Sequence, residues 1–151
     1  MNLSRTEAFW RFSRVSYDRP GVATLCLALQ DRAGRDVNIL LLALFAGAVL
    51  GRKLDPEDFA ALEAAGAAWR DEVTLPLRAA RRGLKAWAED AEAAALRRSV
   101  QAAELDSERL AQRLLLAALS DGPVEIPSPA LARANLVLYG GEEAAALTDL
   151  I

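Results

Sequence analysis

The sequence predicts an all-α fold, a single-domain helical bundle built around one buried helix. Glycine and proline are sparse, with 9 and 6 occurrences in 151 residues, and they stand mostly between apolar stretches. Apolar residues recur at spacings of three and four, whereas the alternation typical of a strand is absent from the sequence. The chain is 53% apolar and 26% charged, a balance typical of one globular domain.

The first helices follow from their start and stop signals. Ser4-x-x-Glu7 is a capping box, and the aromatic residues that follow it, beginning with Phe9, occupy one face of the predicted first helix. Pro20 begins a second helix, and Gly34 ends it.

The most apolar segment, residues 37–50, predicts the buried central helix. Asp36 is a plausible N-cap for it. The segment has 14 residues, whereas a helix needs about 20 to span a membrane, so we expect no membrane span. Asp55 and Pro56 begin a fourth helix, and Pro76 is expected to interrupt or kink the chain before a fifth.

Two apolar stripes with helical spacing dominate residues 73–118. They consist of Val73, Leu77, Ala80, Leu84, Trp87 and Ala91, followed by Leu96, Val100, Ala103, Ser107, Leu110, Leu114 and Ala117. The spacing breaks between the stripes, so we predict a turn near residues 89–93 and an antiparallel helical hairpin. One continuous helix is the alternative, because no glycine or proline lies between Gly83 and Gly122.

The domain organisation follows from the remaining boundary signals. Residues 1–120 are predicted to form the helical core domain. Residues 121–151 are predicted to form a linker and short helices that pack on this core, with Pro129 at one helix start and a stop at residues 140–141.

The chain lacks most of the side chains used in catalysis and metal binding. It contains no histidine and one cysteine, Cys26, which excludes histidine-dependent triads, histidine-ligated metals and an internal disulfide. We predict no catalytic residues and no cofactor, and a non-catalytic role is favoured over an enzyme. A lone thiol in an apolar run and an N-terminus without a signal-peptide pattern favour a cytoplasmic protein.

Two acidic pairs raise the question of a metal site. Glu89 and Glu92 form an E-x-x-E pair like that of the all-α nucleotide pyrophosphohydrolases, which bind Mg²⁺ with this motif and an E-x-x-D motif. Glu104 and Glu108 are one turn apart, but Ser107 stands where the second motif needs aspartate. We therefore predict no metal and interpret these acids as parts of solvated helix faces.

A basic helix face is the first candidate site. Its members are Arg78, Arg81, Arg82 and Lys85. The functional hypothesis is a non-catalytic interaction or regulatory module that docks an acidic protein partner on this face. The structural alternative is pairing across the hairpin, and the expected register predicts an ion pair between Arg78 and Glu104. The net charge of −3 disfavours nucleic acid as a partner; the oligomeric state stays open.

A polar cluster between the second and third helices is the alternative site. It consists of Gln30, Asp31, Asp36 and Asn38. Polar groups beside a core need hydrogen-bond partners. Turn chemistry would supply them locally, with Asp36 as a cap and Asn38 bonded to nearby backbone. The functional hypothesis is a small-molecule or nucleotide site at this junction.

A long motif near the N-terminus resembles a bacterial helical family of unknown function. It reads FWxFS from Phe9, YxRxGV from Tyr17 and CLxLQDxxGxDVNxLL from Cys26. Trp69 and the segment from Pro76 to Lys85 add to the resemblance, which covers about residues 7–116. The resemblance implies a helical cytoplasmic protein and implies no activity, substrate or catalytic residue.

Overall fold

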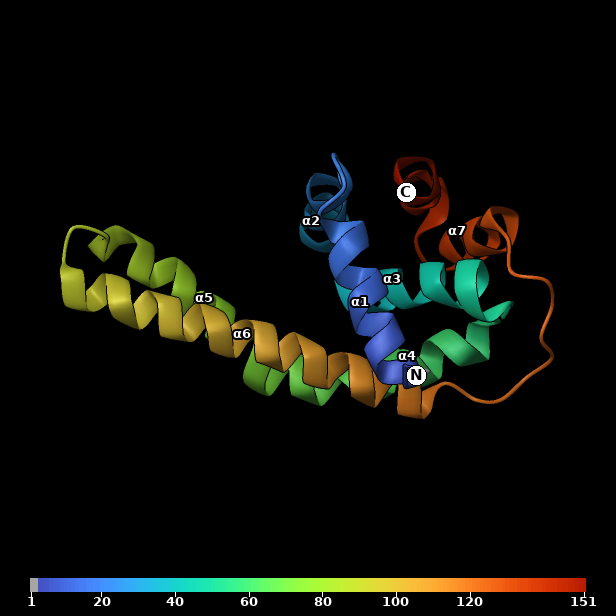
Figure 1. The fold of residues 1–151 in the computed structure, drawn as a ribbon, viewed down its shortest axis with the longest axis horizontal. Coiled ribbons are helices and arrows are strands. Elements are labelled where there is room, and N and C mark those ends of the chain that lie inside the picture. Colours follow the sequence, from blue (N-terminus) through green and yellow to red (C-terminus); the bar gives the residue numbers. More distant parts are fainter. Residues whose placement is uncertain (1–2) are drawn as a thin grey trace.

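The computed structural model describes residues 3–151, which form helices and contain no strand. The predicted all-α class is therefore confirmed. Figure 1 shows most of the helices gathered in a body at one end, with α5 and α6 extending from it as a hairpin.

Local caps set the ends of the first two helices. α1 (Arg5–Tyr17) has the predicted capping box, in which the Glu7 N–H donates to Ser4 Oγ and the Ser4 N–H donates to the Glu7 carboxylate. α2 (Val22–Ala33) ends at Gly34, where φ is 64°. Glycine tolerates this left-handed conformation because it has no Cβ. The turn leads the chain directly into the central helix.

α3 (Val37–Phe45) and the π-helical turn η1 (Ala46–Leu50) form the predicted buried central helix. Every α3 residue after Val37 is buried. Phe9 of α1 stacks on Phe45, with ring centroids 5.1 Å apart. Among residues 3–151, no helix combines the length and apolar character needed to cross a membrane.

A nearly continuous run of helical segments follows η1 along the chain. Its parts are α4 (Pro56–Trp69), the π-helical turn η2 (Arg70–Thr74), α5 (Leu75–Leu84) and the 3₁₀ turn η3 (Lys85–Trp87). The expected interruption at Pro76 takes the form of η2, the wider turn just before it. A proline ring crowds the carbonyl of the preceding turn, and a π-helical turn accommodates that crowding without ending the helix.

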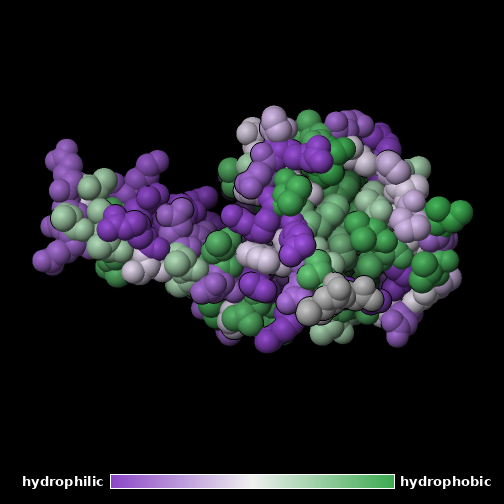
Figure 2. Space-filling model, in the orientation of Figure 1, coloured by the Kyte–Doolittle hydropathy of each residue, from purple (hydrophilic) through white to green (hydrophobic). Residues whose placement is uncertain are grey.

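α6 (Ala91–Ala118) returns antiparallel to α5, and Asp90 caps its start. The predicted hairpin is confirmed, and the alternative of one continuous helix is wrong. Of the two predicted apolar stripes only Ser107 is buried, and Trp87 and Leu96 are 65% and 55% exposed. The other buried residues of α6 are Glu104, Ala111, Gln112, Leu115 and Leu116, so the predicted stripe is displaced by about one residue from the face that packs. Beyond the body each hairpin helix packs only on the other, and hydrophilic residues cover most of this projecting end (Figure 2).

The C-terminal helices pack against α3. An extended segment, residues 119–128, leads to α7 (Pro129–Ala145) and the 3₁₀ turn η4 (Ala146–Leu150). α7 breaks at Gly141, where φ is 73° and ψ is −169°, at the predicted stop. Leu136 and Leu147 belong to the same apolar core as α3.

Candidate functional site

The connection between α2 and α3 places the predicted polar cluster at the edge of the core. Gly34 ends one helix, and Asp36 begins the next. Asp36 caps α3 as predicted: its Oδ1 accepts from the N–H groups of Asn38 and Ile39 at 2.8 and 3.4 Å. One carboxylate oxygen is thus committed to the helix, while the other faces away from it.

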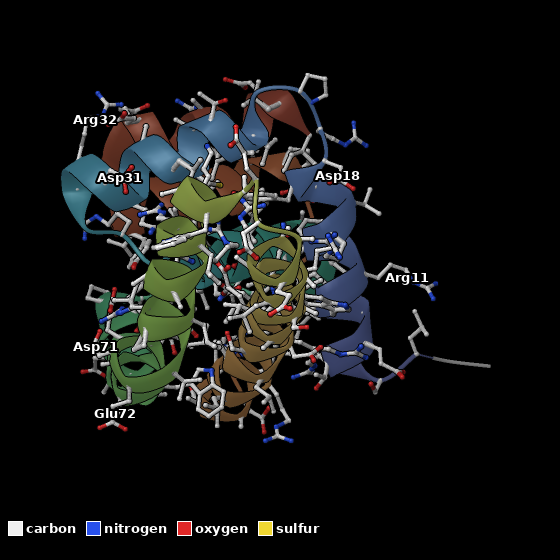
Figure 3. The ribbon with its side chains drawn as sticks, turned by 90° about the vertical axis from the view of Figure 1, so that its left-hand side faces the viewer. Arg11, Asp18, Asp31, Arg32, Asp71 and Glu72 are labelled. Atoms are coloured by element: carbon white, nitrogen blue, oxygen red, sulfur yellow. The ribbon has the colours of Figure 1, made fainter. Side chains whose placement is uncertain are left out.

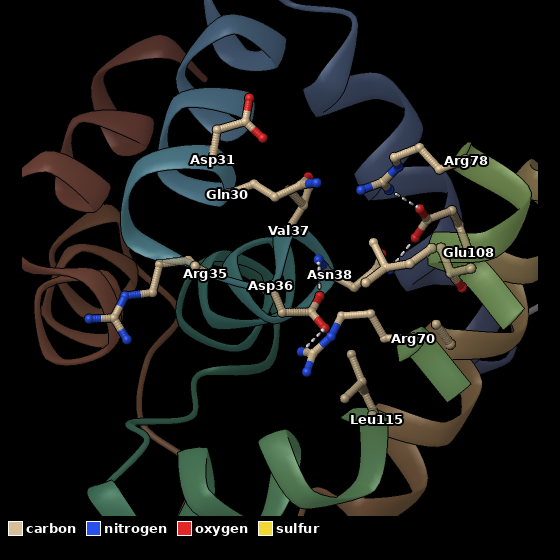
Figure 4. A pocket seen from close by; sticks show the side chains of 15 residues that line it. Gln30, Asp31, Arg35, Asp36, Val37, Asn38, Arg70, Arg78, Glu108 and Leu115 are labelled. Carbon is tan, nitrogen blue, oxygen red and sulfur yellow. Dashed lines mark hydrogen bonds and ion pairs between the residues drawn. The ribbon is translucent and has the colours of Figure 1, made fainter. Parts of the chain in front are cut away.

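A cavity of about 400 Å³, hereafter the larger cavity, opens beside this connection. Its lining includes all four residues of the predicted cluster: Gln30, Asp31, Asp36 and Asn38. The opposite wall consists mainly of η2, α5 and α6, which contribute Arg70, Arg78 and Glu108 (Figure 4). This volume falls within the roughly 300–1,000 Å³ typical of small-molecule sites. Figure 3, a view along the hairpin, shows Asp31 on α2 on the same side as Asp71 of η2.

Arg70 connects two carboxylates at the edge of the larger cavity. Its Nη1 lies 3.3 Å from Asp36 Oδ2 and 3.4 Å from Glu63 Oε2. The Tyr139 hydroxyl accepts from the Asp36 N–H at 3.0 Å and donates to Glu63. Burial raises the pKa of Asp36 above its ordinary value, against the lowering effect of its cap hydrogen bonds and of Arg70. Asp36 is thus a buried carboxylate held by two backbone N–H groups and Arg70.

Glu108 occupies the wall formed by α6. Its Oε1 accepts from Arg78 Nη2 at 2.9 Å, and its Oε2 accepts from Asn38 Nδ2. Burial raises the pKa of Glu108 more than these partners lower it, and the nearby charges of Asp36 and Glu104 add to the rise. Two carboxylates whose burial disfavours their charged forms thus line one cavity, and a cationic group in that cavity would stabilise the charged forms.

The basic helix face is largely engaged within the hairpin. The predicted Arg78–Glu104 ion pair is present, with Nε 3.3 Å from Oε1. Arg81 also binds Glu104, and Arg78 also binds Glu108. Two of the four predicted basic residues are therefore neutralised by α6 and leave less positive charge for a partner.

The other two basic residues differ in position. Arg82 and Lys85 are exposed, and neither forms an ion pair with any part of residues 3–151. Arg82 lines a second cavity of about 190 Å³, hereafter the smaller cavity, whereas Lys85 lines neither cavity. Arg78 and Glu108 line both cavities. The fold thus brings the polar cluster and most of the basic face to adjoining cavities.

A chain of hydrogen bonds joins side chains that line the smaller cavity. Asn38 was expected to bond nearby backbone, but its side chain instead donates to Glu108 and accepts from Gln112 Nε2 at 3.1 Å. Gln112 Nε2 also donates to Ser13 Oγ at 2.9 Å. Because an ionised Glu108 only accepts, it orients the Asn38 amide, which in turn orients Gln112.

The lining of both cavities falls within one family match. Residues 8–115 match a family described as a protein of unknown function (DUF2390). The chain belongs to the DUF2390 family. The resemblance to a family of unknown function over about residues 7–116 is thereby confirmed. No curated protein and no solved structure matches the chain.

Sequence reasoning missed part of the site in this DUF2390 chain. Arg70 carries no local signal, because it reaches Asp36 only through the turn geometry of η2. In the sequence, Glu108 is distinguished only by its position one helical turn after Glu104. The basic residues of α5 are the sequence feature that could have identified Glu108. A partly buried arginine in a helical hairpin needs a carboxylate partner, and the facing helix is where that partner lies.

The carboxylates of the DUF2390 chain are engaged by arginines rather than gathered together. No group of three or more Cys, Asp or Glu within residues 3–151 is arranged to hold a metal ion. Glu89 and Glu92 are exposed near the hairpin turn, as predicted. The prediction of a solvated face is wrong for the other pair: Glu104 is buried and Glu108 is half-buried, because both bind Arg78 across the hairpin.

Arg81→Gln is expected to destabilise the protein at neutral pH and to have little effect in acid. Burial pushes the pKa of Glu104 up, but the hydrogen bonds and charges of Arg81 and Arg78 together hold it below the ordinary 4.5. Such a carboxylate contributes stability above its unfolded-state pKa, and this contribution is lost as the pH falls through the folded-state value. Urea unfolding should show a loss of about 1 kcal/mol near pH 7 that shrinks below about pH 4.5.

Arg82→Gln is the matched control, because Arg82 is the next residue and forms no ion pair within residues 3–151. It should change the free energy of unfolding by less than about 0.5 kcal/mol at every pH. Asp36 and Glu108, with raised pKa values, have the opposite pH dependence: their contribution is full below the ordinary pKa and declines as the pH rises. Asp36 and Glu108 are present in the parent protein and in both variants, so their contributions cancel when the three free energies of unfolding are compared. A pH-independent loss in Arg81→Gln would contradict the assigned ion pair.

Proposed function

We propose that this protein binds a small polar molecule carrying a positively charged amine in the larger cavity. The observation that supports this most directly is the presence of Asp36 and Glu108 on the walls of one cavity of about 400 Å³. Burial raises the pKa of both carboxyls despite their present partners. An ammonium group that donates to these carboxylates would form charge-assisted hydrogen bonds and offset the cost of burying them.

The same cavity offers donors for a negative group on the ligand. Arg70 uses Nε and Nη1 for its carboxylate partners, and Arg78 uses Nε and Nη2. Within residues 3–151, Arg70 Nη2 and Arg78 Nη1 have no acceptor. A ligand carboxylate would supply one, so the lining favours a zwitterion such as a free amino acid over a simple amine.

The test is a ligand panel of free amino acids, their N-acetyl derivatives and simple amines, measured by thermal shift and calorimetry. At least one free amino acid should bind saturably and, at 100 times its Kd, raise the free energy of unfolding by about 2.7 kcal/mol. Its N-acetyl derivative lacks the cation and should bind at least about tenfold more weakly.

Two glutamates of α6 form a matched pair of variants. Glu108→Gln removes a charge from the larger cavity and should weaken amino acid binding about tenfold or more. Glu104→Gln removes a charge one turn away, from a residue that lines only the smaller cavity, and should not weaken this affinity, because it leaves Asp36 and Glu108 in place. Equal effects of both variants, or no binding by any amine in the panel, would contradict the proposed function.

The hypothesis of an acidic partner on the basic face has narrower support. Arg82 and Lys85 are the only members of this face left exposed within residues 3–151, since Arg78 and Arg81 bind glutamates of α6.

A cytoplasmic location is part of our proposal, and the buried Cys26 supports it. Burial raises the pKa of this thiol to about 11, which keeps it unreactive, and a free thiol suits a reducing compartment.

A further inference from the structure

The smaller cavity lies between the hairpin and helices α1 and α2. Its volume is about 190 Å³. An engineered protein cavity of roughly 150 Å³ accepts benzene, so this space suits a single ring rather than a nucleotide. Arg82 and Trp10 line this cavity only, so it can be probed separately from the larger cavity.

One part of the smaller cavity is apolar and aromatic. Trp10 and Tyr17 of α1, Leu27 of α2 and Leu105 of α6 contribute to it. Leu27 and Leu105 are 40% and 39% exposed, although each lines this concave surface. A flat apolar group placed here would cover both leucines and remove their surface from water.

The rest of the lining carries more positive than negative charge. Arg14, Arg78, Arg81 and Arg82 face only Glu104 and Glu108. Both glutamates are already bound by Arg78 and Arg81. Arg82 therefore has no carboxylate partner within residues 3–151, and a ligand anion would provide one.

Tyr17 can add a donor to the same anion site. Burial raises the pKa of its phenol above the ordinary 10.0, so the hydroxyl keeps its proton at neutral pH.

Gln112 supplies a buried acceptor without a donor. It is 1% exposed and lines the smaller cavity. Its Nε2 is fixed by Ser13 and Asn38, which leaves Oε1 without a hydrogen bond to any of residues 3–151. Leaving a buried acceptor without a hydrogen bond is unfavourable, so a ligand O–H or N–H that reaches it is favoured.

We infer that the smaller cavity binds a small cyclic organic acid. The ring lies against Trp10 and the exposed leucines, the carboxylate binds Arg82, and a hydroxyl or amine on the ring donates to Gln112. This site shares lining residues such as Arg78 and Glu108 with the amine site proposed above, but Trp10 and Arg82 line only this one, and it selects the opposite charge.

The test uses the full chain with benzoate, benzamide, 3-hydroxybenzoate and 4-hydroxybenzoate as probes. Binding is followed by the indole N–H NMR signals of Trp10, Trp69 and Trp87, assigned with single Trp→Phe variants. Benzoate should shift the Trp10 signal saturably, whereas the uncharged benzamide should bind at least about tenfold more weakly. One of the hydroxybenzoates should bind more tightly than benzoate.

Variants of two neighbouring basic residues distinguish a specific binding site from nonspecific attraction of anions. Arg82→Gln should weaken benzoate binding at least about fivefold, whereas Lys85→Gln should leave it unchanged because Lys85 lines neither cavity. Equal binding of benzoate and benzamide, equal effects of the two variants, or no saturable shift of Trp10 would overturn the inference. If neither hydroxybenzoate exceeds benzoate, the role of Gln112 is overturned. Amino acid binding by an Asp36→Asn variant tests the larger cavity separately, because Asp36 lines that cavity and not the smaller one.

Discussion

A chain that ends at Ser120 is expected not to fold cooperatively. The truncation removes Leu131, Leu136 and Leu147, which are buried in the full chain. Burying each leucine contributes roughly 1.5–3 kcal/mol, while a whole domain is stable by only about 5–15 kcal/mol. The truncation also exposes the apolar face of α3 on which α7 packs. Circular dichroism during urea unfolding should show a broad transition without a folded baseline.

The truncation also removes Asn135, which serves three buried backbone groups. Its Oδ1 accepts from the Leu54 N–H at 2.8 Å, and its Nδ2 donates to the carbonyls of Ala43 and Arg52 at 3.1 and 2.9 Å. These groups belong to α3 and to the chain after η1. Each would lose its partner on truncation, at a cost of about 1–3 kcal/mol if it stayed buried.

Full-length protein with Val124→Ser and Ile126→Ser is the control for the truncation. These two residues of the extended segment are 72% and 86% exposed, so their replacement should leave the free energy of unfolding nearly unchanged. A synthetic peptide of residues 121–151 should restore folding of the truncated chain. Cooperative unfolding of residues 1–120 alone would contradict this expectation and show that they fold as a separate domain.

Gly47→Ala is expected to destabilise the protein by at least about 3 kcal/mol. A Cβ at this position would lie 2.3 Å from the Ala132 backbone nitrogen and 2.7 Å from the Leu131 carbonyl carbon. Backbone atoms of a packed helix cannot rotate away as a side chain can, so α7 would have to move off η1. The Gly47 carbonyl also accepts from the Ser128 N–H at 3.1 Å, at the start of α7.

Gly83→Ala is the matched control for Gly47→Ala. Gly83 is exposed in α5, and a Cβ there would have no atom within 4 Å. Alanine has the higher helix propensity, so this variant should gain about 0.5–1 kcal/mol. Urea unfolding of the two variants beside the parent protein measures both effects. A loss below about 1 kcal/mol for Gly47→Ala would contradict the tight contact between α7 and η1.

The helix ends were predictable because their causes are local. The capping box at Ser4, the N-cap at Asp36 and the glycine stop at Gly34 each act within about one turn of their own residue. The hairpin was predictable for a similar reason, since an apolar stripe and a break in its phase are both readable along the chain. The Arg78–Glu104 pair followed once the register of the two helices was set.

The exposure of Trp87 was not predictable from the same stripe. Spacing says which residues share a helix face, but the number of helices that cover that face depends on distant segments. At the projecting end of the hairpin only two helices meet, so a residue on the apolar face stays 65% exposed. Nearer the body, α1 and α3 also pack on α6, and Ser107 and Gln112 are buried there.

The sequence by itself determined the all-α class, the buried central helix, the hairpin and the exclusion of histidine chemistry. It also identified two polar regions, but as separate features of separate helices. Only the tertiary structure placed Asp36 across a cavity from Glu108 and turned two of the four basic residues, Arg78 and Arg81, toward α6. The reason is physical: caps and periodicity act over a few residues, whereas burial of a charge and the choice of its partner depend on which distant helices pack together.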